Sequence, residues 1–194
     1  IDMLAGPTEL GIVADASTNP KYIALDLISQ SEHSKDTFCY LITNSEKLAK
    51  SINKIISELI PKIKRSDLVK TSLKQNGFIA ICKNRSEMIK LANELAPEHL
   101  QIMTRNPQNL SSKITSPGLI LLGKETPSSA SDYLLGSNHI LPTNGFGKTR
   151  GSLSVLDFIK ASTYVTNSKL SLKKISKYLD ILTNAEDLPN HYEA

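Results

Sequence analysis

Short apolar runs alternate along the chain with longer segments in which apolar residues recur every three or four positions. The short runs are rich in β-branched residues and indicate buried strands. They cover residues 8–15, 37–44, 77–83, 100–104 and 118–123. The longer segments carry the apolar stripe that is typical of amphipathic helices. This alternation predicts βαβ units, with a mainly parallel sheet and helices on both of its faces.

Capping residues and prolines indicate where the helices begin and end. Asn19 is a suitable N-cap for a helix over residues 20–32, whose first position is a proline. Asn44 or Ser45 can cap a second helix, which we expect to stop near Pro61.

The pattern changes beyond residue 137. A loop rich in Gly, Asn, Thr and Pro covers residues 137–152, and the later patterns, LSVLDFIKAST and SLKKISKYLDILTNAEDL, are helical. We therefore predict an incomplete Rossmann-like α/β domain over residues 1–150 and a small helical C-terminal appendage over residues 151–194. Because open parallel sheets bind ligands in the crevice at the carboxyl ends of their strands, we expect the site there.

Composition excludes several classes of function. The 194 residues are 40% hydrophobic, and 23 Lys and Arg exceed 19 Asp and Glu by only four charges. The basic residues are scattered, aromatic residues make up 5% and tryptophan is absent, so we expect no nucleic-acid partner. No apolar run reaches about 18 residues, so we expect no membrane span. No signal peptide is visible.

The two cysteines, Cys39 and Cys82, lie far apart in the apolar runs TFCYLI and FIAICK. This spacing fits neither a disulfide framework nor a zinc knuckle. We expect two buried, reduced thiols, which favour a cytoplasmic location.

Four histidines each stand close to a carboxylate or an amide in the sequence. They are His33, His99, His139 and His191. Gln30 and His33 lie three residues apart and share one face of a helix end. They are either a polar helix end that faces water or part of a metal or substrate site. Imidazole and carboxylate are common zinc ligands, and Asp132 and His191 are candidates to complete the set.

Glu98 and His99 directly follow Pro97, which ends a helix over residues 85–96. An adjacent Glu and His at the start of a strand can perform two different proton transfers. The alternative is a capped helix end with a surface ion pair.

Several segments together resemble the histidinol dehydrogenase family. They are IDMLAGPTEL, DLISQSEH, LAPEHLQI, DYLLGSNHILPT, GSLSVLDFIK and AEDLPNH, in the family's order and spacing. The resemblance spans essentially the entire chain. It implies a zinc- and NAD-dependent enzyme that oxidises L-histidinol through L-histidinaldehyde to L-histidine.

The resemblance also implies roles for individual residues. The zinc ligands would be Gln30, His33, Asp132 and His191. His99 would take protons during alcohol oxidation, and Glu98 would activate the water that attacks the aldehyde. The residues that contact the substrate would be Thr8, Gln30, His33, His99, Asp132, Glu186 and His191. Thr8 stands where the family often has serine, and Glu186 suits the ammonium group of the substrate. His139 receives no role.

The family chain is about twice this length, so the resemblance implies the carboxyl-terminal half of the enzyme. The upstream half, with most of the NAD-binding domain, would then be supplied by a separate chain, or this chain would be cut from a longer one. No G-x-G-x-x-G pattern follows a strand here, and the NAD contacts stay unassigned. The family is a homodimer in which the C-terminal tail reaches the neighbouring subunit's site. The alternative is a folded fragment that lacks the NAD-binding half, binds zinc and catalyses nothing alone.

Overall fold

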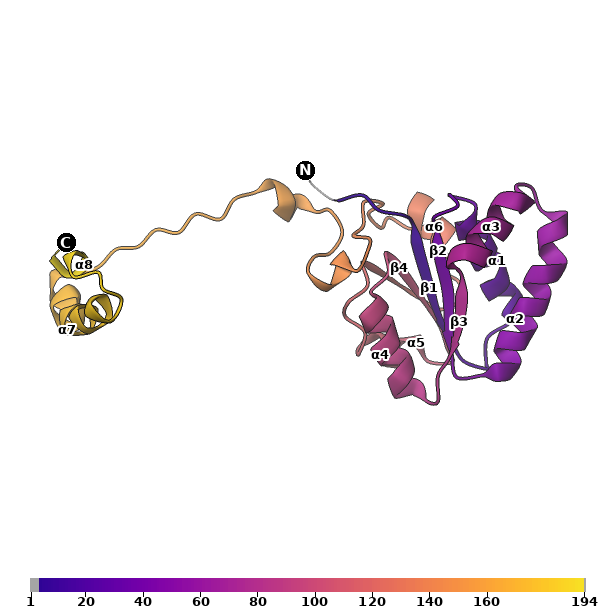
Figure 1. The fold of residues 1–194 in the computed structure, drawn as a ribbon, viewed down its shortest axis with the longest axis horizontal. Coiled ribbons are helices and arrows are strands. Elements are labelled where there is room, and N and C mark those ends of the chain that lie inside the picture. Colours follow the sequence, from indigo (N-terminus) through magenta and orange to yellow (C-terminus); the bar gives the residue numbers. More distant parts are fainter. Residues whose placement is uncertain (1–3, 194) are drawn as a thin grey trace. The chain divides into compact units, whose positions relative to one another are not determined.

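A computed structural model describes residues 4–193 of the chain, which form two compact units that divide between Asp157 and Phe158. The first unit contains a five-stranded parallel sheet (Figure 1). Its strands are β1 (Glu9–Ala14), β2 (Phe38–Thr43), β3 (Phe78–Ile81), β4 (His99–Met103) and β5 (Leu119–Leu122). Their order in the sheet is β3-β2-β1-β4-β5. The chain adds β2 and β3 on one side of β1 and then crosses over to add β4 and β5 on the other side. The predicted α/β class and parallel sheet are confirmed.

Helices cover both faces of this sheet, as predicted (Figure 1). They are α1 (Pro20–Ser31), α2 (Glu46–Leu59), η1 (Ile60–Lys62), α3 (Ser66–Asn76), α4 (Arg85–Leu95), α5 (Pro107–Ser111) and α6 (Ser128–Tyr133). Side chains alternate along each strand, so Leu10 and Ile12 pack towards α1 and α2, whereas Val13 packs towards α4 and α5. The core therefore has two apolar layers with the sheet between them.

The predicted helix starts are confirmed at the level of single hydrogen bonds. Asn19 Oδ1 accepts from the Lys21 amide at 2.9 Å, and Ser45 Oγ accepts from the Leu48 amide at 3.2 Å. Ser45 is thus the N-cap of the second helix, and Asn44 is not.

The sequence analysis did not identify α3, α5 or α6. It also predicted a helix over LSVLDFIKAST, which is wrong. That segment contains only the short 3₁₀ helix η3 (Val155–Phe158), and residues 159–168 contain no helix. The apolar side chains of this segment, such as Val155 and Ile159, are exposed. An isolated helix of this length is marginal in water without a packing partner.

The second unit contains α7 (Lys169–Ala185) and α8 (Asn190–Glu193). The α7 pattern was predicted, and α8 was not. Many apolar side chains of α7, among them Leu170, Ile175 and Leu182, are exposed. Among residues 4–193, no helix is long and apolar enough to cross a membrane.

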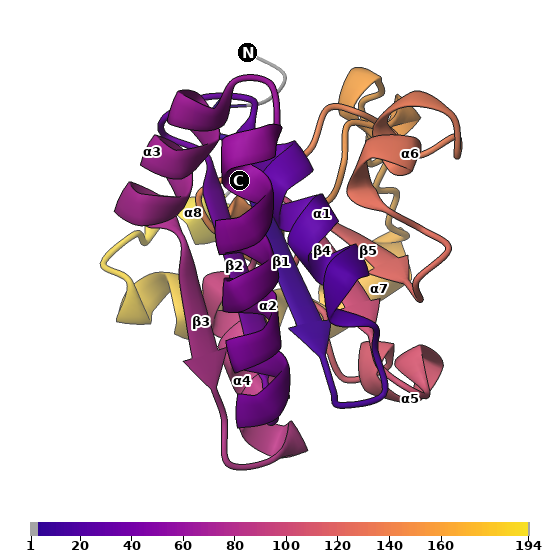
Figure 2. The ribbon, with the colours of Figure 1, turned by 90° about the vertical axis from the view of Figure 1, so that its right-hand side faces the viewer.

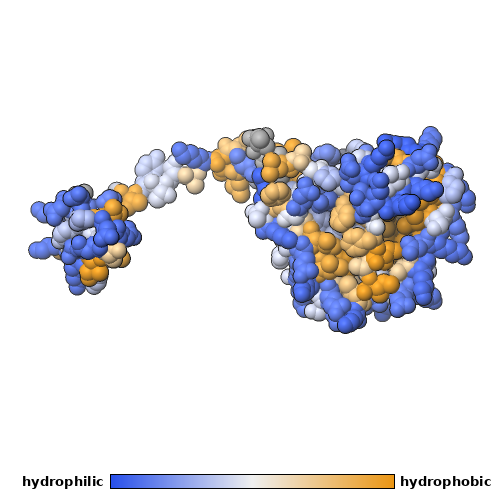
Figure 3. Space-filling model, in the orientation of Figure 1, coloured by the Kyte–Doolittle hydropathy of each residue, from blue (hydrophilic) through white to orange (hydrophobic). Residues whose placement is uncertain are grey.

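The β3 edge of the sheet carries an apolar surface (Figure 3). Phe78 and Ile81 are exposed there, and the Phe78 ring stacks on Tyr40 with 4.9 Å between ring centroids. Cys39 and Cys82 are buried free thiols, as expected. Burial raises the pKa of Cys39 to about 12.

Candidate functional site

The candidate residues of the first unit gather at the edge where the strands begin. His99 is the first residue of β4, and its neighbours in the sheet are Leu10 near the start of β1 and Leu119 at the start of β5. Because α1 crosses back over the sheet, its C-terminal end brings Gln30 and His33 to this same edge. Figure 2 shows α6 at this end of the sheet, opposite the arrowheads of the strands. The candidate residues therefore lie at the amino ends of the strands and not at the carboxyl ends, because they follow helices and precede strands.

A cavity of about 330 Å³ lies between the end of α1 and α6. It is lined by Ser29, Gln30, Glu32, His33, Arg65, Ser129, Asp132 and Tyr133. Gln30 is buried at 3% exposure, and its Oε1 accepts from Ser128 Oγ at 3.3 Å, which joins α1 to α6. Three of the four predicted zinc ligands thus line one cavity.

Arg65 is a lining residue that the sequence analysis missed. It adopts a left-handed conformation, with φ of 57°, at the turn between η1 and α3. Because α3 was not identified from the sequence, nothing in the pattern placed this guanidinium group near Gln30 and His33.

His99 lies between two carboxylates, and its exposure is only 3%. Its Nε2 is 3.0 Å from Oδ1 of Asp132, which is hydrogen-bond distance. Its Nδ1 is 3.5 Å from Oε2 of Glu98, an ion-pair contact without hydrogen-bond geometry. The predicted pair of Glu98 and His99 is therefore connected through His99 to Asp132, which lines the cavity.

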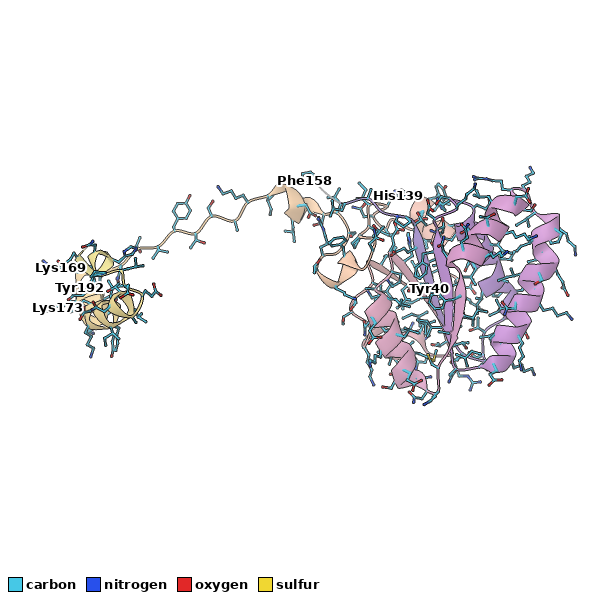
Figure 4. The ribbon with its side chains drawn as sticks, in the orientation of Figure 1. Tyr40, His139, Phe158, Lys169, Lys173 and Tyr192 are labelled. Carbon is cyan, nitrogen blue, oxygen red and sulfur yellow. The ribbon has the colours of Figure 1, made fainter. Side chains whose placement is uncertain are left out.

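This arrangement shifts the proton affinity of both partners. Burial by itself would lower the pKa of His99, but its contacts with Asp132 and Glu98 outweigh burial and raise this pKa to about 9. Burial would raise the pKa of Asp132, but the His99 hydrogen bond and the nearby charges of His139 and His33 hold it below its usual range. Figure 4 shows His139 near α6 at the same edge of the sheet. One histidine, His99, is therefore hydrogen-bonded to Asp132, and two others are near enough to lower its pKa.

Glu9 is a second residue that the sequence analysis missed, although it belongs to the GPTEL segment. Its amide donates to Glu98 Oε2 at 3.1 Å, and its own Oε2 accepts from the Glu98 amide at 3.0 Å. Its Oε1 accepts from the Asn144 amide at 3.1 Å. Burial is the largest influence on this carboxyl and raises its pKa, although these backbone hydrogen bonds partly oppose the shift.

Comparison with known proteins identifies the relatives of this arrangement. The family model described as histidinol dehydrogenase matches residues 1–194. The chain belongs to the histidinol dehydrogenase family. It is 39% identical over 194 residues to a histidinol dehydrogenase of Bacillus cereus, and 37% identical over 195 residues to one of Methanopyrus kandleri. Each match covers all of this chain and 45% of the relative, so the chain spans about half the length of these relatives.

The fold is also that of a solved family member. The crystal structure of histidinol dehydrogenase from Elizabethkingia anophelis matches with a TM-score of 0.87 and 33% sequence identity. The match covers 99% of this chain and 44% of the other.

The remaining residues implied by the resemblance to histidinol dehydrogenase lie outside the cavity lining. Thr8 is half-buried just before β1, where its carbonyl accepts from the Phe38 amide at 2.9 Å. Glu186 and His191 belong to the second unit, where both are exposed. Glu186 is the C-cap of α7, and His191 lies in α8.

The metal-binding capacity of the first unit rests on a mixed set of donors. Within residues 4–193, no three side chains of His, Cys, Asp and Glu converge as they would around a metal ion. The cavity offers one imidazole, one carboxylate and the amide oxygen of Gln30, an N and O set that suits a borderline divalent cation. A tetrahedral site made from these residues requires a fourth ligand from another segment or another copy.

Proposed function

We propose that this chain is the carboxyl-terminal half of a zinc- and NAD-dependent histidinol dehydrogenase, which oxidises L-histidinol through L-histidinaldehyde to L-histidine. The observation that carries the proposal is the convergence of Gln30, His33 and Asp132 on one cavity, with His99 hydrogen-bonded to Asp132. Membership of the family supports the reaction.

Zinc would be held by Gln30, His33 and Asp132 of one subunit and by His191 of a second subunit. The donor types fit zinc, and three of these residues already share one cavity. When bound, the ion would serve as a template that orients the imidazole and amine of the substrate. Glu32 and Asp132 bring two carboxylates to the cavity lining, against the one guanidinium group of Arg65, and a carboxylate suits the ammonium group.

His99 and Glu98 would perform the proton transfers. In its neutral form, His99 would take the proton of the alcohol, and its place between two carboxylates stabilises the imidazolium that forms. Glu98 would take a proton from the water that attacks the aldehyde. The oxidation also requires a hydride acceptor, which NAD⁺ supplies in this family, and no residue of this chain is assigned to its binding.

A homodimer would complete the site. Glu186 would hold the substrate ammonium and His191 the metal ion, both in the neighbouring subunit's cavity. The exposed apolar side chains of α7 support this arrangement, because such a surface is typical of one that packs on another. The upstream half would come from a separate chain or from the same, longer polypeptide, and the two free thiols suit the reducing cytoplasm.

The experiment that tests this function is complementation. The purified chain is mixed with the upstream segment of the Bacillus cereus relative, and reduction of NAD⁺ by L-histidinol is followed. We expect turnover from the mixture and none from either chain alone. Turnover should vanish with His99→Asn while the zinc content, measured by mass spectrometry, is unchanged. Glu98→Gln should also slow turnover, whereas Glu125→Gln, the matched control at an exposed glutamate, should leave it unchanged. A mixture that binds zinc but does not oxidise histidinol would leave the alternative, an inactive zinc-binding fragment.

A further inference from the structure

Glu9 and Glu98 exchange hydrogen bonds across the starts of two neighbouring strands. Each carboxylate accepts from the other residue's backbone amide, at 3.0 and 3.1 Å. The backbone pairing of β1 with β4 begins one residue later, at Leu10 and His99. The exchange thus extends the contact between the two strands by one residue. The exchange therefore fixes the Glu98 backbone and the Glu98 side chain at once.

A third segment meets Glu9 at this point. Oε1 of Glu9 accepts from the Asn144 amide. One buried carboxylate therefore joins three segments of the chain, GPTEL, APEHL and LPTNG. The backbone of Glu98 also contacts β5, because the Glu98 carbonyl accepts from the Leu119 amide at 2.9 Å. The peptide that carries Glu98 is thus held from β1 and from β5.

This arrangement divides the two oxygens of Glu98 between different tasks. Oε2 accepts from the Glu9 amide and lies 3.5 Å from His99 Nδ1. Among the described residues, no group donates a hydrogen bond to Oε1. The side chain is 12% exposed and Oε1 is not itself buried, so this oxygen is accessible to a water molecule.

We propose that Glu9 is a positioning residue that fixes Glu98, so that one carboxylate oxygen stays beside His99 and the other is free to bind the attacking water. This inference rests on the proposed function. Both carboxylate oxygens of Glu9 already accept backbone hydrogen bonds, from Glu98 and Asn144, and the residue is only 6% exposed, so it acts through Glu98 and not on the substrate.

The step that depends on Glu98 is the hydration of the aldehyde. The water oxygen bonds to the aldehyde carbon as Glu98 Oε1 takes one water proton, and the aldehyde oxygen takes a proton from His99. The alcohol oxidation that precedes it uses His99 and needs no water. Loss of Glu9 should therefore slow aldehyde oxidation more than alcohol oxidation.

The test compares Glu9→Gln and Glu9→Ala with wild type in the complemented enzyme, with L-histidinol and L-histidinaldehyde as separate substrates. We expect kcat for the aldehyde to fall by about 10–100-fold with KM nearly unchanged, because small misplacements of catalytic groups have effects of this size. The NADH formed per histidinol consumed should fall from two towards one. Glu9→Gln should be the milder variant, since its amide oxygen can still accept one of the two hydrogen bonds.

Ser72→Ala is the matched control. It removes a buried hydrogen bond, from Ser72 Oγ to the Thr37 carbonyl at 3.1 Å, that lies away from Glu98. If the Glu9 variants and Ser72→Ala slow both steps equally, Glu9 has only a structural role and the proposal is overturned.

A second measurement needs no turnover, so it separates this inference from the proposed function. Nuclear Overhauser contacts between the Glu98 side chain and the His99 ring are recorded in the chain alone. They should be present in wild type and Ser72→Ala, weakened in Glu9→Gln and lost in Glu9→Ala. Contacts of full strength in both Glu9 variants would show that Glu98 holds its position without Glu9. If Glu9→Ala does not fold, Glu9→Gln decides the question.

Discussion

Asp26 lowers the stability of the chain at neutral pH, and replacing it with asparagine should increase that stability. This aspartate is half-buried on α1. Burial raises its pKa from 3.8 to about 6, and the nearby Gln101 amide opposes the shift only in part. Gln101 is itself buried, with its Nε2 donating to the Thr126 carbonyl at 3.1 Å and its Oε1 unpartnered. Asp26→Asn keeps the shape of the side chain and removes the charge.

The size of the effect follows from proton linkage. The folded state binds the Asp26 proton more tightly than the unfolded state, so this residue lowers stability as pH rises from about 4 to about 6. Each unit of pKa corresponds to about 1.4 kcal/mol, so the full shift would amount to about 3 kcal/mol. Solvent screening of a partly exposed group reduces this, and we expect a gain of about 1–3 kcal/mol at pH 7.

The assay is urea unfolding of wild type and Asp26→Asn at several pH values between 3.5 and 8, a range of roughly two units on each side of the transition. The difference between the two proteins should be near zero at about pH 4, increase through about pH 6 and then stay constant. Asp36→Asn removes the same charge from an exposed position and controls for net charge. A difference that is independent of pH, or a less stable variant at pH 7, would refute the reasoning.

Three other predictions concern packing, capping and thiol chemistry. A Cβ atom on Gly11 would lie 2.7–2.8 Å from the Tyr40 ring and hydroxyl, so Gly11→Ala should destabilise the chain by about 1–3 kcal/mol in urea; an unchanged midpoint would contradict this. Ser45→Ala removes the N-cap of α2 and should lower the unfolding free energy by about 0.5–2 kcal/mol, whereas Ser51→Ala, at a half-buried position inside the same helix, should have a smaller effect. Cys39 is buried with its pKa raised to about 12, so a thiol reagent at pH 8 should modify it only after urea unfolds the chain; rapid modification of the native protein would count against its burial.

Local patterns were sufficient for most of the elements in the first unit. The five strands, the N-cap at Asn19 and the burial of both cysteines were predicted, and Ser45 was one of two candidates for the N-cap of the second helix. Short helices were not, because α5 and α6 have too few residues to show a 3.6-residue period. The prediction of a helix over LSVLDFIKAST is wrong for a different reason. The segment has a helical pattern of apolar residues, but these side chains are exposed and pack on no surface among the described residues.

The sequence by itself determined which residue types are available for chemistry and which family the chain resembles. Only the tertiary structure decided their placement. The end of α1, the start of β4 and α6 meet at the amino edge of the sheet, because a helix that follows a parallel strand must cross back before the next strand begins. That crossing brings Gln30 beside Ser128 and Asp132 beside His99. Spacing along the chain carries no record of such contacts, and for the same reason it gave no sign that Glu9 holds Glu98 in place.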